Sequence, residues 1–420
     1  TTEAEGHVVG LVADGASVER VVAGMDVAIV TDRTPFYGES GGQVGDTGVI
    51  TGYHDLHITV ADTHKRADDL TVHQGRVDAG TLSVGDSVTL SVDAARRDAV
   101  RANHSATHLL HSALRRTLGR HVAQKGSLVA PDRLRFDFAH PKGMSEAEVR
   151  AVEEAVNERI RKNAPVGSHV TTPDQAEKEG AVALFGEKYG DAVRVLAMGG
   201  EDDNGAPYSM ELCGGTHVDR TGDIALFKIL AETAVGGGVR RLEAVTGDAA
   251  RHYFEEREAR LEEAAERLKA RPEEVPERLD QLLEERRRLA DEVADLRRRL
   301  AAGGGGGGPE TRDVGGVTYA PQLLEGVPPK DLKGLADEMK KKIGSGVVAL
   351  VTVNEGKVSL VVGVTEDRTD RLDAVTLVRA GAQAVGGKGG GGRPDMAQAG
   401  GPDGANASAA LQAIEETLQS

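Results

Sequence analysis

The chain has 420 residues, which is more than one compact hydrophobic core usually organises, and its length suggests about three domains. It carries 51 Lys and Arg residues against 67 Asp and Glu residues, so its formal charge is -16 and the molecule as a whole repels nucleic acid. Any contact with RNA would therefore depend on local basic patches and on shape. Aromatic residues make up only 3% of the chain and tryptophan is absent, which argues against a single-strand binder built on stacked bases.

Cys213 is the single cysteine, so no intramolecular disulfide can form, and we expect a reducing, cytoplasmic setting. The sequence shows no secretory signal, no transit peptide and no apolar run long enough to span a membrane. It begins at Thr1, without methionine and in the middle of a pattern, and we expect it to be a piece of a longer protein.

Residues 1–93 are predicted to form a small all-β domain, most simply a barrel. Short apolar stretches alternate there with Gly, Asp and Thr at close intervals. The stretches lie at residues 8–12, 27–30, 58–60 and 88–92. The segment 36–46 contains paired glycines that could bring backbone close to a ligand, although on residue types alone a tight structural turn is the better interpretation. It is not a phosphate loop, because no helix with a following Lys-Ser or Lys-Thr appears.

Residues 94–247 are predicted to form an α/β domain. Asp93 is suited to be an N-cap, and apolar residues then recur at helical spacing until Gly119. A second helix is predicted over residues 145–163, with Ser145 and Glu148 as a capping box. Strands are predicted near residues 133–138, 166–171, 194–198 and 239–245.

The last third of the chain is predicted to hold a helical segment, a linker and a globular domain. Residues 248–302 are dense in Glu, Arg and Leu, with three-four spacing of apolar residues, which predicts a helical hairpin or short coiled coil turning at Pro272 and Pro276. Residues 303–309 are a glycine linker that cannot hold a fixed helix. Residues 310–420 are predicted to form an α/β domain. The whole chain is thus expected to be a multidomain α+β protein.

Two histidine motifs predict a metal site. His104 and His108 are four residues apart in the predicted helix, so both imidazoles project from one face and can reach a single ion. Cys213 and His217 follow on a glycine-containing loop. One thiolate and three imidazoles suit tetrahedral zinc. A lone pair of histidines at this spacing would be weak evidence, and the single cysteine in a second motif strengthens it.

The role of the metal stays open at this point. Four protein ligands normally mean a closed, structural ion, so ligand count supports a structural site at least as well as a catalytic one. A metalloprotease is a poor interpretation, because Ser105 stands where a general-base glutamate would follow the first histidine. Polar groups that could make the site hydrolytic are Gln124, Thr216 and Asp219. His111 lies on roughly the same helical face and is expected to pack rather than to bind the ion.

Taken together, these motifs closely resemble the C-terminal half of the bacterial alanyl-tRNA synthetases, collinearly over essentially the whole chain. The residues that carry the resemblance are 36–46, His104-x3-His108-Leu-Leu-His111, Gln124-Lys125-Gly126-Ser127-Leu128, Cys213-Gly-Gly-Thr-His217-Val218, Gly238-Val-Arg240-Arg241 and the glycine-rich segment 386–395. Free-standing alanyl-tRNA editing proteins share the barrel and metal motifs. The helical segment and the glycine-rich terminal domain favour the synthetase.

The resemblance implies an editing domain that hydrolyses seryl- and glycyl-tRNA(Ala), followed by a C-terminal domain that contacts the tRNA elbow and helps form a homodimer. It also implies that His104, His108, Cys213 and His217 bind zinc. Gln124 would lie close to the scissile ester, and Thr216 would hydrogen-bond the serine hydroxyl. The expected mechanism has zinc orienting the terminal adenosine while a water held by Gln124 or by backbone groups attacks the ester; zinc binding that water directly is the alternative.

Three other functions compete with a zinc-dependent deacylase. The chain could be a non-catalytic tRNA-binding and dimerisation fragment with a structural zinc, or a free-standing editing protein. The terminal module also occurs in phosphoesterases of the Asp-His-His type, but that motif is absent from the sequence. Alanyl-tRNA synthetases carry an N-terminal catalytic core with no counterpart here, so we expect this chain to edit and to bind tRNA but not to aminoacylate.

Overall fold

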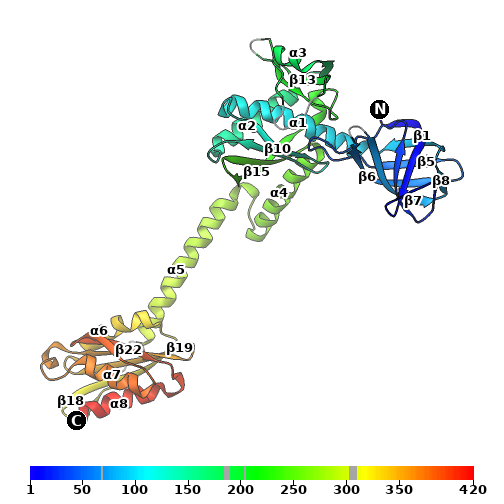
Figure 1. The fold of residues 1–420 in the computed structure, drawn as a ribbon. Coiled ribbons are helices and arrows are strands. Elements are labelled where there is room, and N and C mark those ends of the chain that lie inside the picture. The colour runs from blue at the N-terminus through cyan, green and yellow to red at the C-terminus, as the bar shows by residue number, and fades with distance from the viewer. Residues whose placement is uncertain (68–69, 184–189, 203–204, 302–309) are drawn as a thin grey trace. The chain divides into compact units, whose positions relative to one another are not determined.

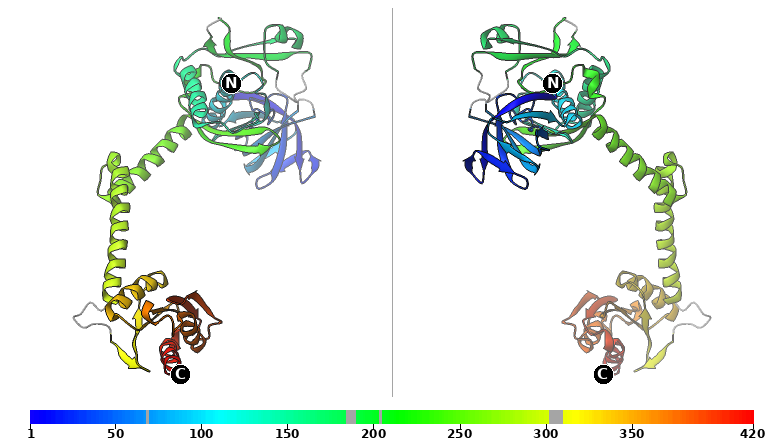
Figure 2. Two further views of the ribbon diagram at one scale, coloured as in Figure 1. Left: turned by 90° about the vertical axis from the view of Figure 1, so that its left-hand side faces the viewer. Right: turned by 90° about the vertical axis from the view of Figure 1, so that its right-hand side faces the viewer.

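The structure, a computed structural model, describes residues 1–67, 70–183, 190–202, 205–301 and 310–420, and it omits the side chains of residues 297–301. The chain forms two compact units, Thr1–Leu261 and Glu262–Ser420. Each is shown in Figures 1 and 2. The predicted glycine linker, residues 303–309, lies outside the described residues.

A closed β-barrel of six antiparallel strands begins the first unit, as predicted. Around the barrel the strands are β1 (Glu3–Ala13), β4 (Asp26–Thr31), β7 (Leu70–Ala79), β6 (His57–Arg66), β5 (Gly48–Gly52) and β9 (Ser87–Val92). Pairing of β9 with β1 closes the sheet on itself. Alternate residues such as Ile29, Ile58 and Leu90 fill the interior, because successive strand side chains point to opposite faces. Short β2 (Ala16–Val18), β3 (Arg20–Val22) and β8 (Thr81–Ser83) lie outside this ring.

Two helices follow, with ends within two residues of the predicted ones. Helix α1 (Ala94–Leu118) begins where the Asp93 carboxylate accepts a hydrogen bond from the Arg96 amide, and it ends at Gly119. Helix α2 (Glu146–Arg161) begins with the complete Ser145–Glu148 capping box. Both helices pack on a common core, so α1 is buried over much of its length.

Two antiparallel sheets accompany these helices. The first, in the order β10-β11-β16-β15, covers the core of α1 and α2; the second, in the order β12-β13-β14, carries the small helix α3 (Pro173–Lys178). Their strands are β10 (Gln124–Val129), β11 (Leu134–Ala139), β16 (Val239–Thr246), β15 (Phe227–Gly236), β12 (Gly167–Thr171), β13 (Val193–Glu201) and β14 (Pro207–Leu212). All pairings between these named strands are antiparallel, so this region is α+β and the predicted α/β class was wrong.

Helices α4 (Gly247–Leu268) and α5 (Val275–Ala301) occupy the predicted helical segment. The chain breaks between them at a short 3-10 turn that begins at Pro272, whereas Pro276 lies inside the first turn of α5. The apolar stripe of α5 is largely exposed, with Leu279 at 49% and Leu289 at 48%. Among the described residues, therefore, two helices are confirmed, but the coiled-coil packing predicted for them is not seen.

The second unit contains a six-stranded mixed sheet with helices on both faces. Its order is β17-β18-β19-β20-β22-β21, and only β18 and β19 are parallel. The strands are β17 (Arg312–Val314), β18 (Val317–Glu325), β19 (Val347–Asn354), β20 (Lys357–Val364), β21 (Gly390–Arg393) and β22 (Met396–Gly401). Helix α6 (Leu332–Ile343) packs on one face, and α7 (Ala374–Ala384) and α8 (Ala407–Gln419) pack on the other. None of the described helices is long and apolar enough to cross a membrane.

Candidate metal centre

The four predicted ligands converge in the first unit. Helix α1 places His104 and His108 one turn apart, with their rings stacked at a centroid distance of 5.2 Å. Strand β14 ends at Leu212, and the following loop brings Cys213 and His217 to the same point. The Cys213 Sγ lies 3.5 Å from His104 Nε2 and 3.3 Å from His217 Nε2. One donor atom from each of the four residues lies within 4.8 Å of the others, which is a spacing that one ion can bridge.

Each histidine is held through its second ring nitrogen. His104 Nδ1 contacts Gln43 Oε1 at 2.7 Å, His108 Nδ1 contacts Glu211 Oε2 at 2.6 Å, and His217 Nδ1 contacts Ser105 Oγ at 3.2 Å. Among the residues that the structure describes, the buried Nε2 of His108 has no hydrogen-bond partner. Imidazoles anchored at Nδ1 leave Nε2 free to donate its lone pair to a metal, which is the arrangement found around protein metal sites.

The electrostatics of the cluster also favour a cation. Burial raises the pKa of the Cys213 thiol, but His104 and His108 lower it more strongly, so the pKa lies well below its usual value. Burial likewise opposes ionisation of Glu211, yet His108 and His111 lower its pKa to about 2. A thiolate and a carboxylate are thus both charged in the protein interior. Burying two anions is costly unless positive charge accompanies them, and a divalent cation supplies it.

The histidines respond to the same charges in different ways. Burial lowers the pKa of His108, but Glu211 and Cys213 outweigh it and raise the pKa to about 10, so in the metal-free protein this ring carries a positive charge and a bound metal would displace its Nε2 proton. Burial and the neighbouring His104 lower the pKa of His217 to about 3, so its imidazole is neutral and ready to bind a metal. Three nitrogen donors and one thiolate at this spacing fit tetrahedral zinc.

A cavity of about 590 Å³ opens beside this cluster. Its lining includes His104, Cys213 and Gly215 from the cluster and its loop, Tyr37 from the segment between β4 and β5, and Arg194 from β13. Arg194 donates from Nη1 to the Gly215 carbonyl at 2.8 Å, which ties the loop to the neighbouring sheet. A cavity of this size can admit a small polar ligand next to the cluster.

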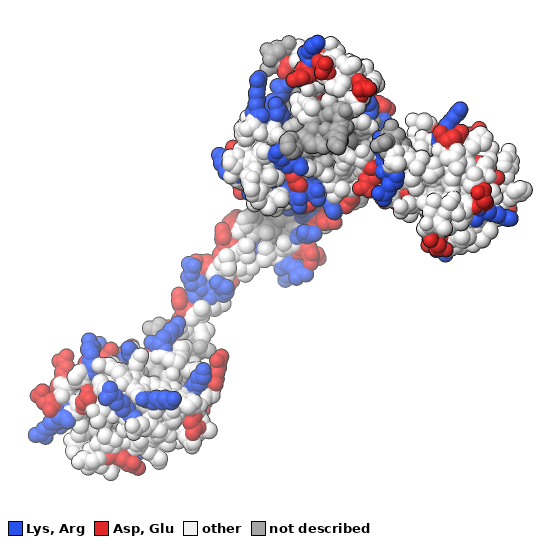
Figure 3. Space-filling view, viewed as in Figure 1, with Lys and Arg blue, Asp and Glu red and all other residues white. Residues whose placement is uncertain are grey.

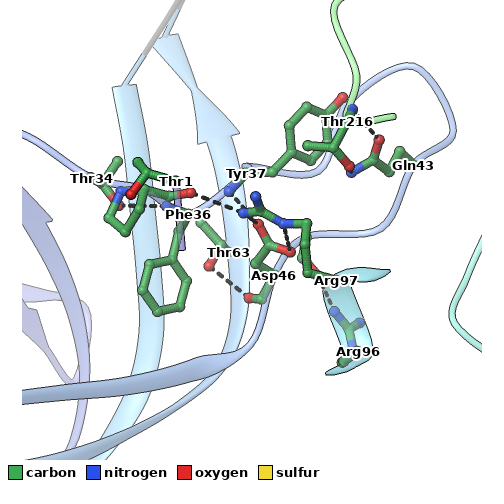
Figure 4. Close-up of polar contacts among 12 residues, drawn as sticks. Thr1, Thr34, Phe36, Tyr37, Gln43, Asp46, Thr63, Arg96, Arg97 and Thr216 are labelled. Atoms are coloured by element: carbon green, nitrogen blue, oxygen red, sulfur yellow. Dashed lines mark hydrogen bonds and ion pairs between the residues drawn. The ribbon is translucent and has the colours of Figure 1, made fainter. Parts of the chain in front are cut away.

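The predicted catalytic residues, Gln124 and Thr216, are not part of the lining of this cavity. Gln124, at the start of β10, donates from Nε2 to Ser127 Oγ at 3.4 Å. Thr216 is half-buried, and its Oγ1 accepts a hydrogen bond from Gln43 Nε2 at 2.9 Å (Figure 4). Asp219 is exposed and pairs with Arg101 at 3.0 Å. His111 does not join the four ligands, and its Nδ1 contacts Glu211 Oε1 at 2.8 Å.

Sequence reasoning missed two residues of the site, Gln43 and Glu211. Gln43 lies in the segment that was interpreted as a tight turn, and nothing in its residue type reveals a partner 173 positions away. Glu211 could have been found, because it is the single charged residue of its strand and lies two positions before Cys213. It is only 2% exposed, and buried carboxylates are normally paired.

Three segments of the chain match known protein families. Residues 1–96 match tRNA synthetases class II (A), residues 193–243 match the threonyl and alanyl tRNA synthetase second additional domain, and residues 316–420 match the DHHA1 domain.

Curated relatives match over the full length of the chain. The Alanine–tRNA ligase of Granulibacter bethesdensis is 57% identical over 419 residues, covering 100% of this chain and 47% of the relative. That of Chelativorans sp. is 57% identical over 426 residues, covering 100% of this chain and 48% of the relative. The chain therefore spans about half the length of the relatives it matches. Among solved structures, the C-Ala domain of Aquifex aeolicus alanyl-tRNA synthetase is 30% identical, covers 26% of this chain and 99% of its own length, and gives a TM-score of 0.25.

Proposed function

The chain belongs to the alanyl-tRNA synthetase family, matching the C-terminal part of its members, and we propose that it hydrolyses mischarged Ser-tRNA(Ala) and Gly-tRNA(Ala). The observation that carries this proposal is the joining of a buried His-His-Cys-His cluster to a polar cavity of about 590 Å³. A metal that served folding alone would need no adjoining cavity, whereas hydrolysis of an ester requires room for the substrate beside the reactive groups.

The proposed ligands of a zinc ion are His104, His108, Cys213 and His217. When bound, zinc supplies a positive charge that can polarise an oxygen of the substrate or hold the terminal adenosine. The chain's own residues are proposed to position the substrate and the attacking water. Arg194 at the cavity wall can contact a phosphate or carbonyl oxygen, and Gln124, whose Nε2 donates to Ser127 Oγ, is proposed to hold the attacking water.

Thr216 is proposed to recognise the serine side chain. Because its Oγ1 already accepts from Gln43, the hydroxyl proton is available to be donated to a substrate oxygen. A site built to bond a hydroxyl rejects an amino acid that lacks one. Hydrogen bonding to a hydroxyl cannot explain the removal of glycine, which has no side chain. We propose that the cavity also excludes the alanine methyl group by its shape.

The remaining parts of the chain are proposed to bind the tRNA. The proposed domains are a barrel (1–93), an editing domain (94–247), a helical segment (248–302), a linker (303–309) and a tRNA-binding and dimerisation domain (310–420). The protein is proposed to act in the reducing cytoplasm. On the face drawn in Figure 3, basic and acidic side chains are interspersed on both units. With a formal charge of -16, contact with tRNA(Ala) must come from such local basic groups and from shape.

The test is single-turnover deacylation of Ser-tRNA(Ala) by the 420-residue chain and by its Cys213→Ala variant, with Ala-tRNA(Ala) as the control substrate. We expect rapid release of serine but not of alanine, lost in the variant together with bound zinc, because the thiolate is one of four ligands. Zinc content and circular dichroism are measured on both proteins.

No release of serine by a folded, zinc-loaded chain would overturn the proposal. It would favour the second candidate, a tRNA-binding fragment with a structural zinc, which the count of four protein ligands supports.

A further inference from the structure

Gln43 is a buried, uncharged side chain that reaches the metal cluster from the barrel region. It lies on the segment between β4 and β5, in the part of the chain that forms the barrel, and its exposed fraction is 0%. Figure 4 shows its amide beside Thr216, across a sequence separation of 173 residues. The proposed function uses Gln43 only as the donor to the Thr216 hydroxyl and gives its oxygen no role, although a buried amide must satisfy its hydrogen bonds.

The contacts of Gln43 fix the orientation of its amide. The backbone amide of Thr216, which can only donate, lies 2.9 Å from Oε1, and the Thr216 hydroxyl lies 2.9 Å from Nε2. The same Oε1 lies 2.7 Å from His104 Nδ1. Since an amide oxygen cannot donate, His104 must carry its proton on Nδ1. Its Nε2, 3.5 Å from Cys213 Sγ, then presents a lone pair to the cluster.

The backbone on both sides of Gln43 is held firmly. Gly42 adopts φ +85°, and a Cβ there would lie 2.6 Å from the Ser127 carbonyl oxygen, so only glycine fits against β10. Val44 donates to the Val129 carbonyl at 3.1 Å, and Val129 donates to the Gly42 carbonyl at 2.7 Å. The amide therefore projects from a segment anchored to the sheet of the metal domain.

A buried ion pair anchors the same segment to α1. Asp46 is 1% exposed and Arg97 is 7% exposed, and the Arg97 guanidinium forms a close ion pair with the Asp46 carboxylate (Figure 4). The Tyr37 amide donates to the same carboxylate at 2.5 Å. Helix α1, which carries His104, is thus bonded to the segment that carries Gln43.

The loop of Cys213 is shaped to receive the Gln43 amide. A Cβ at Gly215 would lie 2.7 Å from Gln43 Oε1 and would also meet the ring of His104. Glycine at this position lets the backbone of the loop approach both side chains at once. The glutamine, the histidine and the loop therefore form one closely packed arrangement.

We propose that Gln43 is a positioning residue with two effects, which rest on the function proposed above. Through Oε1 it fixes His104 in the tautomer whose Nε2 binds the metal. Through Nε2 it occupies the acceptor side of the Thr216 hydroxyl, so that this hydroxyl donates to the serine side chain of the substrate. The barrel region thereby contributes to both metal affinity and amino-acid discrimination.

Two variants of the 420-residue chain separate the two effects. Gln43→Leu removes both polar atoms, whereas Gln43→Glu keeps an oxygen for His104 and for the Thr216 amide but removes the donor to the Thr216 hydroxyl. Gln74→Leu is the matched control, because Gln74 is an exposed glutamine of strand β7 away from the cluster. Melting temperature and circular dichroism establish that each variant folds.

Zinc affinity, measured by competition with a chromophoric chelator, tests the first effect. We expect Gln43→Leu to bind zinc about 10- to 100-fold more weakly, as is usual when a hydrogen bond to a ligating histidine is lost, and Gln43→Glu to stay within about threefold of the unaltered chain. Nitrogen-15 NMR of the histidines in the metal-free chain should show His104 protonated at Nδ1, and should show this preference lost in Gln43→Leu. Unchanged zinc affinity in a folded Gln43→Leu, or a His104 ring protonated on Nε2 and not on Nδ1, would overturn this effect.

Deacylation of two substrates by zinc-loaded protein tests the second effect. In Gln43→Glu the Thr216 hydroxyl turns to donate to the new carboxylate, so release of serine from Ser-tRNA(Ala) should slow about tenfold, the value of one hydrogen bond. Release of glycine from Gly-tRNA(Ala), which has no hydroxyl to bond, should not change. Equal slowing of both substrates would overturn this effect. If the unaltered chain fails to bind zinc, the proposed function fails, while the NMR measurement still decides the role of Gln43.

Discussion

The buried carboxylate of Glu211 orients two histidines at the proposed metal site. Its two carboxylate oxygens accept hydrogen bonds from His108 Nδ1 at 2.6 Å and from His111 Nδ1 at 2.8 Å. The carboxylate is therefore shared by a proposed ligand and by a histidine outside the ligand set. Because a carboxylate has acceptors only, both imidazoles must carry protons on Nδ1, and the His108 Nε2 is left to face the cluster.

Replacing Glu211 by glutamine should weaken both the metal site and the fold. An amide offers one oxygen and one NH2 group, so it cannot accept from both imidazoles, and one buried N–H loses its partner. We expect zinc affinity to fall about 10- to 100-fold and the free energy of unfolding to fall by about 2 kcal/mol. Chelator competition and urea denaturation measure the two quantities. Glu201→Gln, at the exposed end of β13, is the control, and equal effects in the two variants would contradict this role.

Within single elements, local sequence pattern predicted structure well because the deciding contacts are local. The helix containing His104 was predicted to within a residue at each end, since Asp93 and Gly119 mark its limits through contacts inside one turn. The hairpin of β19 and β20 turns at Asn354-Glu355-Gly356, where Glu355 and Gly356 adopt φ +49° and +76°, so this turn too is set by local residue types.

Sequence pattern alone does not determine packing where an element needs a distant partner. The leucines of α5 repeat as in a coiled coil, yet Leu282 and Leu296 are 40% and 51% exposed. A heptad pattern indicates that a helix can pack against the apolar stripe of another helix, but it does not show whether the same chain supplies that second helix. Strand direction in residues 94–247 failed for a similar reason, because β11 pairs with β16 across a hundred residues and local alternation does not encode that pairing.

The barrel contains a histidine whose burial predicts a pH effect on stability. His73 Nδ1 lies 2.9 Å from the Ile29 carbonyl, so this nitrogen carries the proton, and Nε2 accepts from the Thr34 hydroxyl at 2.7 Å. Burial lowers the pKa of His73 below its usual 6.5, while the hydrogen bond to Ile29 opposes the shift. The neutral ring is thus the form that fits the fold.

The sign of the effect follows from where the proton binds. Below pH 6.5 the unfolded chain protonates His73 and the folded chain does not. As the pH is lowered, the free energy of unfolding should therefore decrease by up to about 1.4 kcal/mol per pH unit, until the lowered pKa of the folded chain is reached. A His73→Asn variant lacks this titration, although it should be less stable at neutral pH. Urea denaturation of both proteins between pH 5 and 8 should show their stabilities converging as pH falls. A constant difference would contradict the prediction.

At the scale of the whole molecule, the sequence predicted the four residues that converge at the proposed metal site but not the residues that support them. His104, His108, Cys213 and His217 are recognisable because ligand chemistry limits their types and helical spacing limits their positions. Gln43 and Glu211 are ordinary residues that gain a role only when folding brings a barrel segment and a strand against α1. Long-range proximity of this kind is set by tertiary packing, which residue types do not reveal.

Two compact units in one chain predict two unfolding transitions with different responses to zinc. All four proposed ligands lie in the unit Thr1–Leu261, so zinc should stabilise that unit and leave Glu262–Ser420 unchanged. A ligand that binds only the folded state adds about 2.7 kcal/mol when its free concentration is 100 times its dissociation constant. In calorimetry, removal of zinc with a chelator should therefore lower one transition temperature by several degrees and not the other.

A core substitution identifies which transition belongs to which unit. Leu360 is fully buried in the core of the second unit, and Leu360→Ala should lower the zinc-insensitive transition, since such truncations cost about 2–5 kcal/mol. The zinc-dependent transition should keep its temperature in this variant. If zinc removal and Leu360→Ala both shift a single common transition, the two units unfold as one cooperative body, and metal binding in the first would then also stabilise the proposed tRNA-binding domain in the second.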